Sequence, residues 1–126
     1  MNRVVHFEIH ATNPKRAMSF YSEVFGWRFE KWGESDYWLI ETGPAEEPGI
    51  NGGLIPREIE VEGQDVIAYV CTIDVESIRD TSLKVGANGG QVVVPKTPLA
   101  GMGWHASCRD PEGNLFGLIE YDESVE

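Results

Sequence analysis

The stretch Val4-Val5-His6-Phe7-Glu8-Ile9-His10 decides how the rest of the chain is interpreted. Apolar residues alternate in it with His6, Glu8 and His10, which is typical of a strand with one apolar face and one ionisable face. The apolar face needs a partner, and the ionisable face is the first place to look for chemistry.

A helical pattern follows this strand directly. Thr12 or Asn13 offers an N-cap, Pro14 suits the first helical turn, and Gly26 is a C-cap. Between them, apolar residues recur with the spacing of one helix face. They are Ala17, Phe20, Tyr21, Val24 and Phe25.

The rest of the first half predicts three strands, so its order is βαβββ. These are Trp27–Trp32, Asp36–Thr42 and Ile50–Ile55. The second half repeats the order: Asp74 is the expected N-cap of a helix over Val75–Val85, with Gly86 as its C-cap. Its strands are Val66–Ile73, Gln91–Pro95, Trp104–Arg109 and Leu115–Tyr121.

This repetition predicts an α+β fold of two βαβββ modules that form a curved mixed sheet with a central groove and with helices on the outer face. We expect residues 1–126 to form a single domain, with module one over about 1–57, a linker over about 58–64 and module two over about 65–126. The groove is the default ligand site by geometry.

The charge balance excludes several classes of partner. The chain of 126 residues has 10 basic and 21 acidic side chains and a formal charge of −11. Such a surface repels nucleic acid and anionic lipid. No apolar run is long enough to span a bilayer, and Met1 to Glu8 lacks the apolar segment of a secretory signal, so we expect a cytoplasmic protein. Cys71 and Cys108 are interpreted as small buried hydrophobic residues.

Several motifs resemble one protein family. His6-Phe-Glu-Ile, Asn13-Pro-Lys-Arg-Ala-Met-Ser-Phe-Tyr21 and Val24-Phe-Gly-Trp27 are similar to the opening module of the vicinal oxygen chelate superfamily, and Asp110-Pro-Glu-Gly-Asn-Leu-Phe-Gly-Leu118 is similar to its closing motif. That superfamily includes glyoxalase I, extradiol dioxygenases, fosfomycin-resistance enzymes and bleomycin-binding proteins. The resemblance implies paired βαβββ modules and a homodimer.

The resemblance also implies where a metal would bind, because catalytic members hold a divalent ion with one ligand from each of four strand positions. His6 matches the first position. Ala68 and Gly117 match two others, and the fourth falls near Gly52 and Gly53. A catalytic metal needs at least three protein donors. We therefore expect the family's full metal site to be absent and predict no cofactor. If a divalent metal does bind, His6 and Glu8 are the expected ligands.

The expected ligand-binding residues are polar or aromatic side chains assigned to the groove by strand parity. They are His6, Glu8, His10, Trp38, Trp104 and His105. The simpler interpretation of the histidines and Glu8 is that they are polar residues that line the wall of the groove. The alternative is that they form a rebuilt metal or acid/base site. Core or subunit-interface packing is the simpler interpretation of any single tryptophan.

These observations favour a protein that binds a small organic molecule, possibly a cation, without the family's metal. The tryptophans and the acidic charge motivate this prediction. The alternative is a metal-dependent lyase, isomerase or dioxygenase-like enzyme with a rearranged site around His6 and Glu8. A third interpretation is an accessory domain with a vestigial groove. The sequence leaves open whether the protein is an enzyme.

Overall fold

The computed structural model describes residues 1–57 and 68–126, and the expected linker over about 58–64 lies outside them. The chain forms two compact units, His6–Tyr69 and Met1–Val5 together with Val70–Glu126. The element order is βαβββ followed by a second βαβββ, so the predicted α+β fold is confirmed.

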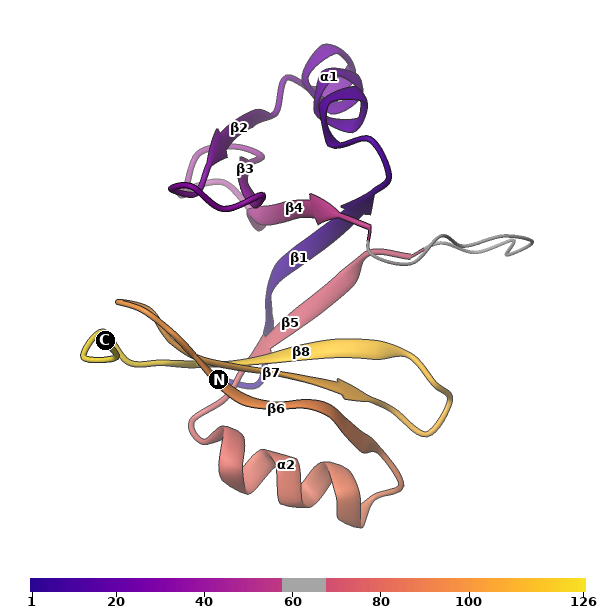
Figure 1. The fold of residues 1–126 in the computed structure, drawn as a ribbon, viewed down its shortest axis with the longest axis vertical. Coiled ribbons are helices and arrows are strands. Elements are labelled where there is room, and N and C mark those ends of the chain that lie inside the picture. Colours follow the sequence, from indigo (N-terminus) through magenta and orange to yellow (C-terminus); the bar gives the residue numbers. More distant parts are fainter. Residues whose placement is uncertain (58–67) are drawn as a thin grey trace. The chain divides into compact units, whose positions relative to one another are not determined.

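The first unit contains a mixed sheet with the strand order β2-β3-β4-β1 and one helix (Figure 1). Strand β1 pairs in parallel with β4, and β3 is antiparallel to both β2 and β4. The elements are β1 Val4–Ala11, α1 Pro14–Phe25, β2 Arg28–Lys31, β3 Trp38–Glu41 and β4 Gly52–Pro56.

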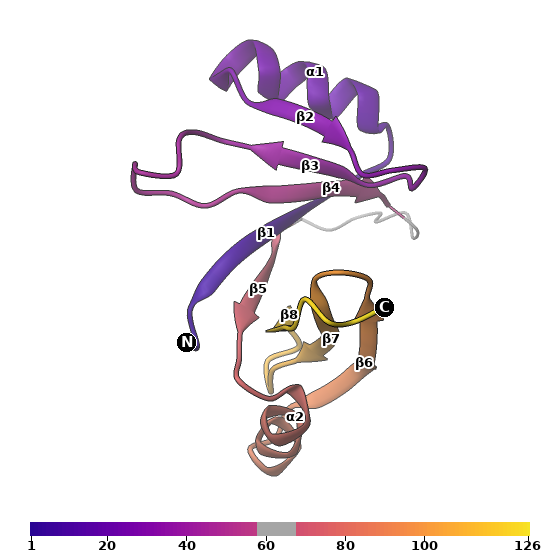
Figure 2. The same ribbon diagram turned by 90° about the vertical axis from the view of Figure 1, so that its left-hand side faces the viewer.

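Helix α1 covers one face of this sheet (Figure 2). Ala17, Met18 and Tyr21 pack against a buried cluster. The cluster consists of Phe7, Ile9, Ala11, Ile40 and Leu54. Since Phe7, Ile9 and Ala11 alternate along β1, the opposite face of that strand carries His6, Glu8 and His10.

The ends of α1 agree with the sequence. The Asn13 side chain accepts a hydrogen bond from the Arg16 backbone N–H at 3.1 Å, and Gly26 adopts a left-handed conformation with φ of 74°. Of the two predicted N-caps, Thr12 and Asn13, it is Asn13 that caps the helix.

The second unit repeats the arrangement with the strand order β5-β8-β7-β6, β5 and β8 being parallel. Val75, Ile78, Ala106, Cys108 and Leu118 form its core, so Cys108 is buried as predicted, whereas Cys71 is half-buried. The elements are β5 Val70–Asp74, α2 Ile78–Ala87, β6 Gln91–Leu99, β7 Gly103–Arg109 and β8 Leu115–Tyr121.

Both predicted caps of the second helix are wrong. The Ser77 side chain accepts from the Asp80 backbone N–H at 3.1 Å, and the helix continues through Gly86. Asp74 does not cap the helix because its carboxylate accepts from the Arg3 backbone N–H at 2.9 Å. Such a partner, far away along the chain, is invisible to a local pattern.

The strands that differ most from their predicted bounds are two strands of the second unit, and the other differences are of one or two residues at an end. Strand β5 begins at Val70, because Ala68 and Tyr69 are not part of a strand, and the earlier residues of the predicted Val66–Ile73 lie outside the described part of the chain. Strand β6 runs on past Pro95 to Leu99, with two register shifts against β7. Prolines are tolerated there because β6 is the last strand of its unit's sheet.

The predicted turn between β7 and β8 is present. Asp110 Oδ1 accepts from the backbone N–H groups of Glu112 and Asn114, both at 2.9 Å. These hydrogen bonds and one from the Asn114 side chain lower the pKa of Asp110. Neither described helix has the length and hydropathy needed to cross a membrane.

Candidate functional site

Four polar side chains of the first unit form a connected group on the sheet, which we call the β1 cluster: His6, Glu8, His10 and Tyr37. His6 Nε2 lies 2.9 Å from the Tyr37 hydroxyl, and His10 Nε2 lies 3.0 Å from Glu8 Oε1. The Tyr37 hydroxyl also hydrogen-bonds to Glu8. All four side chains are half-buried. The structure thus brings together three of the predicted site residues.

The protonation chemistry of these groups gives the hydrogen bonds a direction. An ionised Glu8 only accepts, so both Tyr37 O–H and His10 Nε2–H donate to it. With its proton directed to Glu8, the Tyr37 oxygen accepts from His6 Nε2–H. Burial, together with the Glu8 charge and hydrogen bond, raises the pKa of Tyr37 well above its usual range, so the phenol stays neutral.

The Tyr37 hydroxyl reaches this position because Gly53 has no side chain. Gly53 lies on β4, directly opposite Glu8 on β1. A Cβ atom built on Gly53 would overlap the hydroxyl oxygen and ring carbons of Tyr37. Sequence reasoning missed Tyr37 as a site residue. A glycine within a buried strand was the available signal, since it often marks close approach by another group.

Strand register identifies the equivalent positions of the second unit. In the two parallel pairs, Glu8 faces Gly53 and Thr72 faces Gly117. Thr72 is therefore the counterpart of Glu8, and Gly117 that of Gly53. Two residues earlier on β5, Val70 is the counterpart of His6.

The antiparallel pairs extend the equivalence to Tyr37. Tyr37 lies two residues before the partner of Gly53 on β3, and His105 lies two residues before the partner of Gly117 on β7. His105 likewise covers its glycine, because a Cβ atom on Gly117 would lie 2.8 Å from His105 Nε2. The role of His105 in ligand binding stays a prediction.

The predicted groove tryptophans both pack beside the apolar cores. Trp38 contacts the core of the first unit, and Lys31 Nζ lies 5.8 Å from its ring centroid. Trp104 contacts the core of the second unit, and Lys96 Nζ lies 4.7 Å from its ring centroid. A role for Trp38 and Trp104 in ligand binding remains a prediction.

Trp32 is the tryptophan that the structure places beside the β1 cluster. Its ring lies edge-on to Tyr37 with centroids 5.8 Å apart, and it is 38% exposed. An exposed indole next to a carboxylate-bearing cluster is suited to contact a cationic organic group.

Comparison with known families agrees with this architecture. Residues 3–118 match the model of the Glyoxalase/Bleomycin resistance protein/Dioxygenase superfamily. The chain belongs to this superfamily. No match was found among curated protein sequences.

Several solved structures share this fold at low sequence identity. A hypothetical protein, BH1468 from Bacillus halodurans C-125, is 19% identical with a TM-score of 0.65, over 99% of this chain and 98% of that chain. A methylmalonyl-CoA epimerase in complex with methylmalonyl-CoA and NH4+ is 16% identical with a TM-score of 0.66, over 100% and 98%. The Mn(II)-bound glyoxalase from Novosphingobium aromaticivorans is 18% identical with a TM-score of 0.66, and the match covers 99% of this chain but 41% of that one.

The donors present do not fit the superfamily's four-ligand metal site. The resemblance implies ligand positions at His6, near Gly52 and Gly53, and at Gly117, and strand register makes Val70 the counterpart of His6 at the remaining position. Of these residues only His6 can coordinate a metal. Val70 here replaces Ala68, the residue matched from sequence, because Thr72, two residues after Val70, pairs with Gly117 as Glu8 pairs with Gly53. Neither Ala68 nor Val70 has a side chain that can coordinate a metal, so His6 is still the one donor at these positions.

The alternative metal site around His6 and Glu8 has few donors as well. Within the described ranges, no group of three or more His, Cys, Asp or Glu side chains is arranged to hold a metal ion. The cluster instead satisfies Glu8 with hydrogen bonds from Tyr37 and His10.

Proposed function

We propose that the protein binds a small organic cation at the β1 cluster, through hydrogen bonds and charge and without a bound metal. The observation that carries the proposal is the hydrogen-bonded position of the Tyr37 hydroxyl over Gly53, between His6 and Glu8. Glu8 is the one carboxylate of this cluster, and the Tyr37 and His10 side chains hydrogen-bond to it.

The rest of the protein supports a cationic ligand. The formal charge of −11 attracts cations over a distance. Close to the cluster, the exposed Trp32 ring offers a face to an ammonium or flat cation. The Glu8 side chain is 26% exposed and so remains open to a ligand.

Isothermal titration calorimetry with 2-naphthylmethylammonium tests the proposal. We expect this cation to bind more tightly than the neutral 2-naphthylmethanol, and Glu8→Gln to weaken its binding about tenfold, the value of one well-placed charge interaction. The matched control is Glu76→Gln, which removes the same charge from an exposed position of the second unit. Equal weakening in both variants, or no preference for the cation, would overturn the proposal.

A metal titration tests the alternative enzyme. Equilibrium dialysis against Zn²⁺, Ni²⁺, Mn²⁺ or Fe²⁺, with protein lacking a histidine tag, should show no stoichiometric binding that depends on His6. Binding of about one metal ion per chain in the wild type, and its loss in His6→Ala, would overturn this proposal. It would favour the metal-dependent lyase, isomerase or dioxygenase-like enzyme instead.

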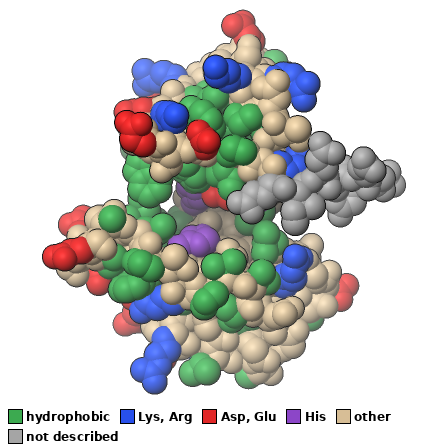
Figure 3. Space-filling view, viewed as in Figure 1, with side chains coloured by type: hydrophobic (Ala, Val, Ile, Leu, Met, Phe, Trp, Pro, Cys, Tyr) green, Lys and Arg blue, Asp and Glu red, His purple; other side chains and the backbone are tan. Residues whose placement is uncertain are grey.

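We propose in addition that the protein is a homodimer. Val24 and Phe25 expose apolar side chains on α1, each more than half exposed. Figure 3 shows hydrophobic side chains reaching the surface of the first unit among charged ones, in the upper half of the view. A second copy could cover such a surface. Light scattering should then give twice the chain mass of 14.0 kDa.

The cytoplasm is the proposed location, on the basis of the acidic composition and the free cysteines. Fractionation of expressing cells, with immunodetection of the protein in the cytosolic fraction, tests this.

A further inference from the structure

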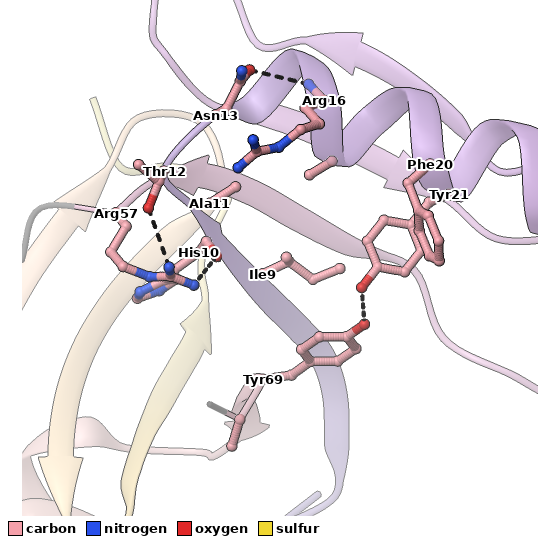
Figure 4. A pocket seen from close by; sticks show the side chains of 12 residues that line it. Ile9, His10, Ala11, Thr12, Asn13, Arg16, Phe20, Tyr21, Arg57 and Tyr69 are labelled. Atoms are coloured by element: carbon pink, nitrogen blue, oxygen red, sulfur yellow. Dashed lines mark hydrogen bonds between the residues drawn. The ribbon is translucent and has the colours of Figure 1, made fainter. Parts of the chain in front are cut away.

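The first unit contains a pocket of about 480 Å³ that is separate from most of the β1 cluster. It lies between the end of β1, helix α1, Arg57 and the residues just before β5 (Figure 4). His10 is shared with the β1 cluster, whereas His6, Glu8 and Tyr37 do not line the pocket. Its volume falls within the range of about 300–1,000 Å³ that small-molecule sites occupy.

The charge of this pocket is opposite to that of the protein. Arg16 and Arg57 line it, and none of the described residues that line it is Asp or Glu. Arg57 donates to the His10 carbonyl at 2.8 Å and to the Thr12 hydroxyl at 3.2 Å, both neutral acceptors. Within the described part of the chain, no carboxylate forms a salt bridge with either arginine. Among the described residues, two guanidinium groups thus face one pocket without an ion pair, in a chain with 21 acidic residues.

The other end of the pocket is aromatic. Figure 4 shows the rings of Phe20, Tyr21 and Tyr69 at the end away from the two arginines. The hydroxyls of Tyr21 and Tyr69 are hydrogen-bonded to each other, and burial with this hydrogen bond raises the pKa of Tyr69 to about 12. Tyr69 therefore adds no negative charge near neutral pH. Phe20 is 56% exposed, so apolar ring surface remains available.

We propose that this pocket is a second ligand site, which binds a small organic anion with its carboxylate or phosphate at the two arginines and its flat apolar body against the aromatic rings. Guanidinium groups form paired, charge-assisted hydrogen bonds to both kinds of head group. Arg57 is held in place by its hydrogen bonds to His10 and Thr12, whereas Arg16 is an exposed residue of α1.

Calorimetric titration with four probes tests this site: 2-naphthoate, 2-naphthyl phosphate, neutral 2-naphthylmethanol and inorganic phosphate. We expect at least one naphthyl anion to bind about tenfold more tightly than the neutral alcohol, and inorganic phosphate to bind weakly because it lacks the apolar body. A preference between the two naphthyl anions identifies the head group, and either preference supports the site.

Variants distinguish binding in this pocket from a general attraction of anions to positive side chains. Arg16→Gln should weaken binding of the preferred anion about tenfold, and Phe20→Ala about threefold. Arg79→Gln is the matched control, since Arg79 is an exposed helical arginine of the second unit. Equal effects of Arg16→Gln and Arg79→Gln, or equal binding of the anions and the alcohol, would overturn the site.

One more variant tests whether the anion pocket and the cation site at the β1 cluster are separate sites. Tyr37→Phe removes a hydroxyl group that does not line the pocket and does not contact the shared residue His10, so it should leave binding of the anion unchanged. A parallel loss of anion binding in Tyr37→Phe and Arg16→Gln would show a single site and would overturn the assignment of a second one.

Discussion

The two modules have the same strand register around their central glycines but differ in the chemistry of the surrounding side chains. In the first, Gly53 is covered by Tyr37, with Glu8 opposite. In the second, Gly117 is covered by His105, with Thr72 opposite. The first module therefore carries a carboxylate where the second carries a hydroxyl.

This difference shows that the fold does not require either chemistry. In both modules the register leaves a glycine without a side chain, and a polar group from the neighbouring strand region fills the space. The ionisable network of the first module, which extends from His6 to His10 through Tyr37 and Glu8, has no equivalent ionisable residues at Val70 and Thr72. The chemical difference between the modules at this position thus lies in a few side chains on one sheet face.

The largest expected effect comes from adding one methyl group at the first glycine. Gly53→Ala should lower the free energy of unfolding by about 3 kcal/mol, because the whole Tyr37 ring must move to admit the Cβ atom. Urea denaturation followed by circular dichroism measures this. Combining it with Tyr37→Ser should recover part of the loss, since the smaller side chain clears the space.

Gly117→Ala is the matched substitution in the second module, and it should cost about 1 kcal/mol. The new Cβ atom would lie 2.8 Å from His105 Nε2 and 2.9 Å from Thr72 Oγ1, which are ends of side chains that can shift. Equal losses at the two glycines would show that Tyr37 is not the rigid element of the first module.

The fold could be predicted from sequence where local signals and tertiary structure agree. The alternation in β1 and the caps of α1 are such signals, and the structure has them at Asn13 and Gly26. The second helix was placed three residues too early because Asp74 and Ser77 are both good N-caps by residue type. A hydrogen bond from Arg3, at the other end of the chain, decides between them.

Tyr37→Phe tests the hydrogen-bonded centre of the first module with a smaller change. Loss of the hydroxyl removes hydrogen bonds to His6 and Glu8, so the free energy of unfolding should fall by about 1.5 kcal/mol near neutral pH. Tyr121→Phe is the control, because Tyr121 is 58% exposed and should change stability by less than about 0.5 kcal/mol. Equal free energies of unfolding for Tyr37→Phe and Tyr121→Phe would mean that the Tyr37 hydroxyl contributes no net stability.

The pH dependence of stability gives a weaker but independent signature. The folded state raises the pKa of Tyr37 above its ordinary value of 10.0, so the neutral phenol is favoured on folding. The contribution of the neutral Tyr37 phenol to the free energy of unfolding is complete below pH 10. It is lost as the pH rises above 10, because the unfolded chain releases the Tyr37 proton at a lower pH than the folded chain does. The unfolding free energy should fall more steeply above pH 10 in the wild type than in Tyr37→Phe. Tyr69 and Tyr121, whose pKa values are also raised, account for the fall that remains.

Three of the four side chains in the β1 cluster can be predicted from the sequence, and the fourth cannot. His6, Glu8 and His10 share a face because strand parity alone places them there. Tyr37 precedes β3, and its contact depends on the pairing of β3 with β4, which no local pattern specifies. The same dependence on register moved the counterpart of His6 from Ala68 to Val70.

The smallest expected difference between the modules lies at their helix N-caps. Asn13 and Ser77 each accept one backbone hydrogen bond at 3.1 Å, from Arg16 and Asp80. Asn13→Ala and Ser77→Ala should therefore each cost about 1 kcal/mol, with a difference between them close to zero. Thermal denaturation of both variants checks this, and Asp74→Ala serves to verify the assignment of the cap. If Asp74→Ala lowered α2 helicity and Ser77→Ala did not, Asp74 would be the cap.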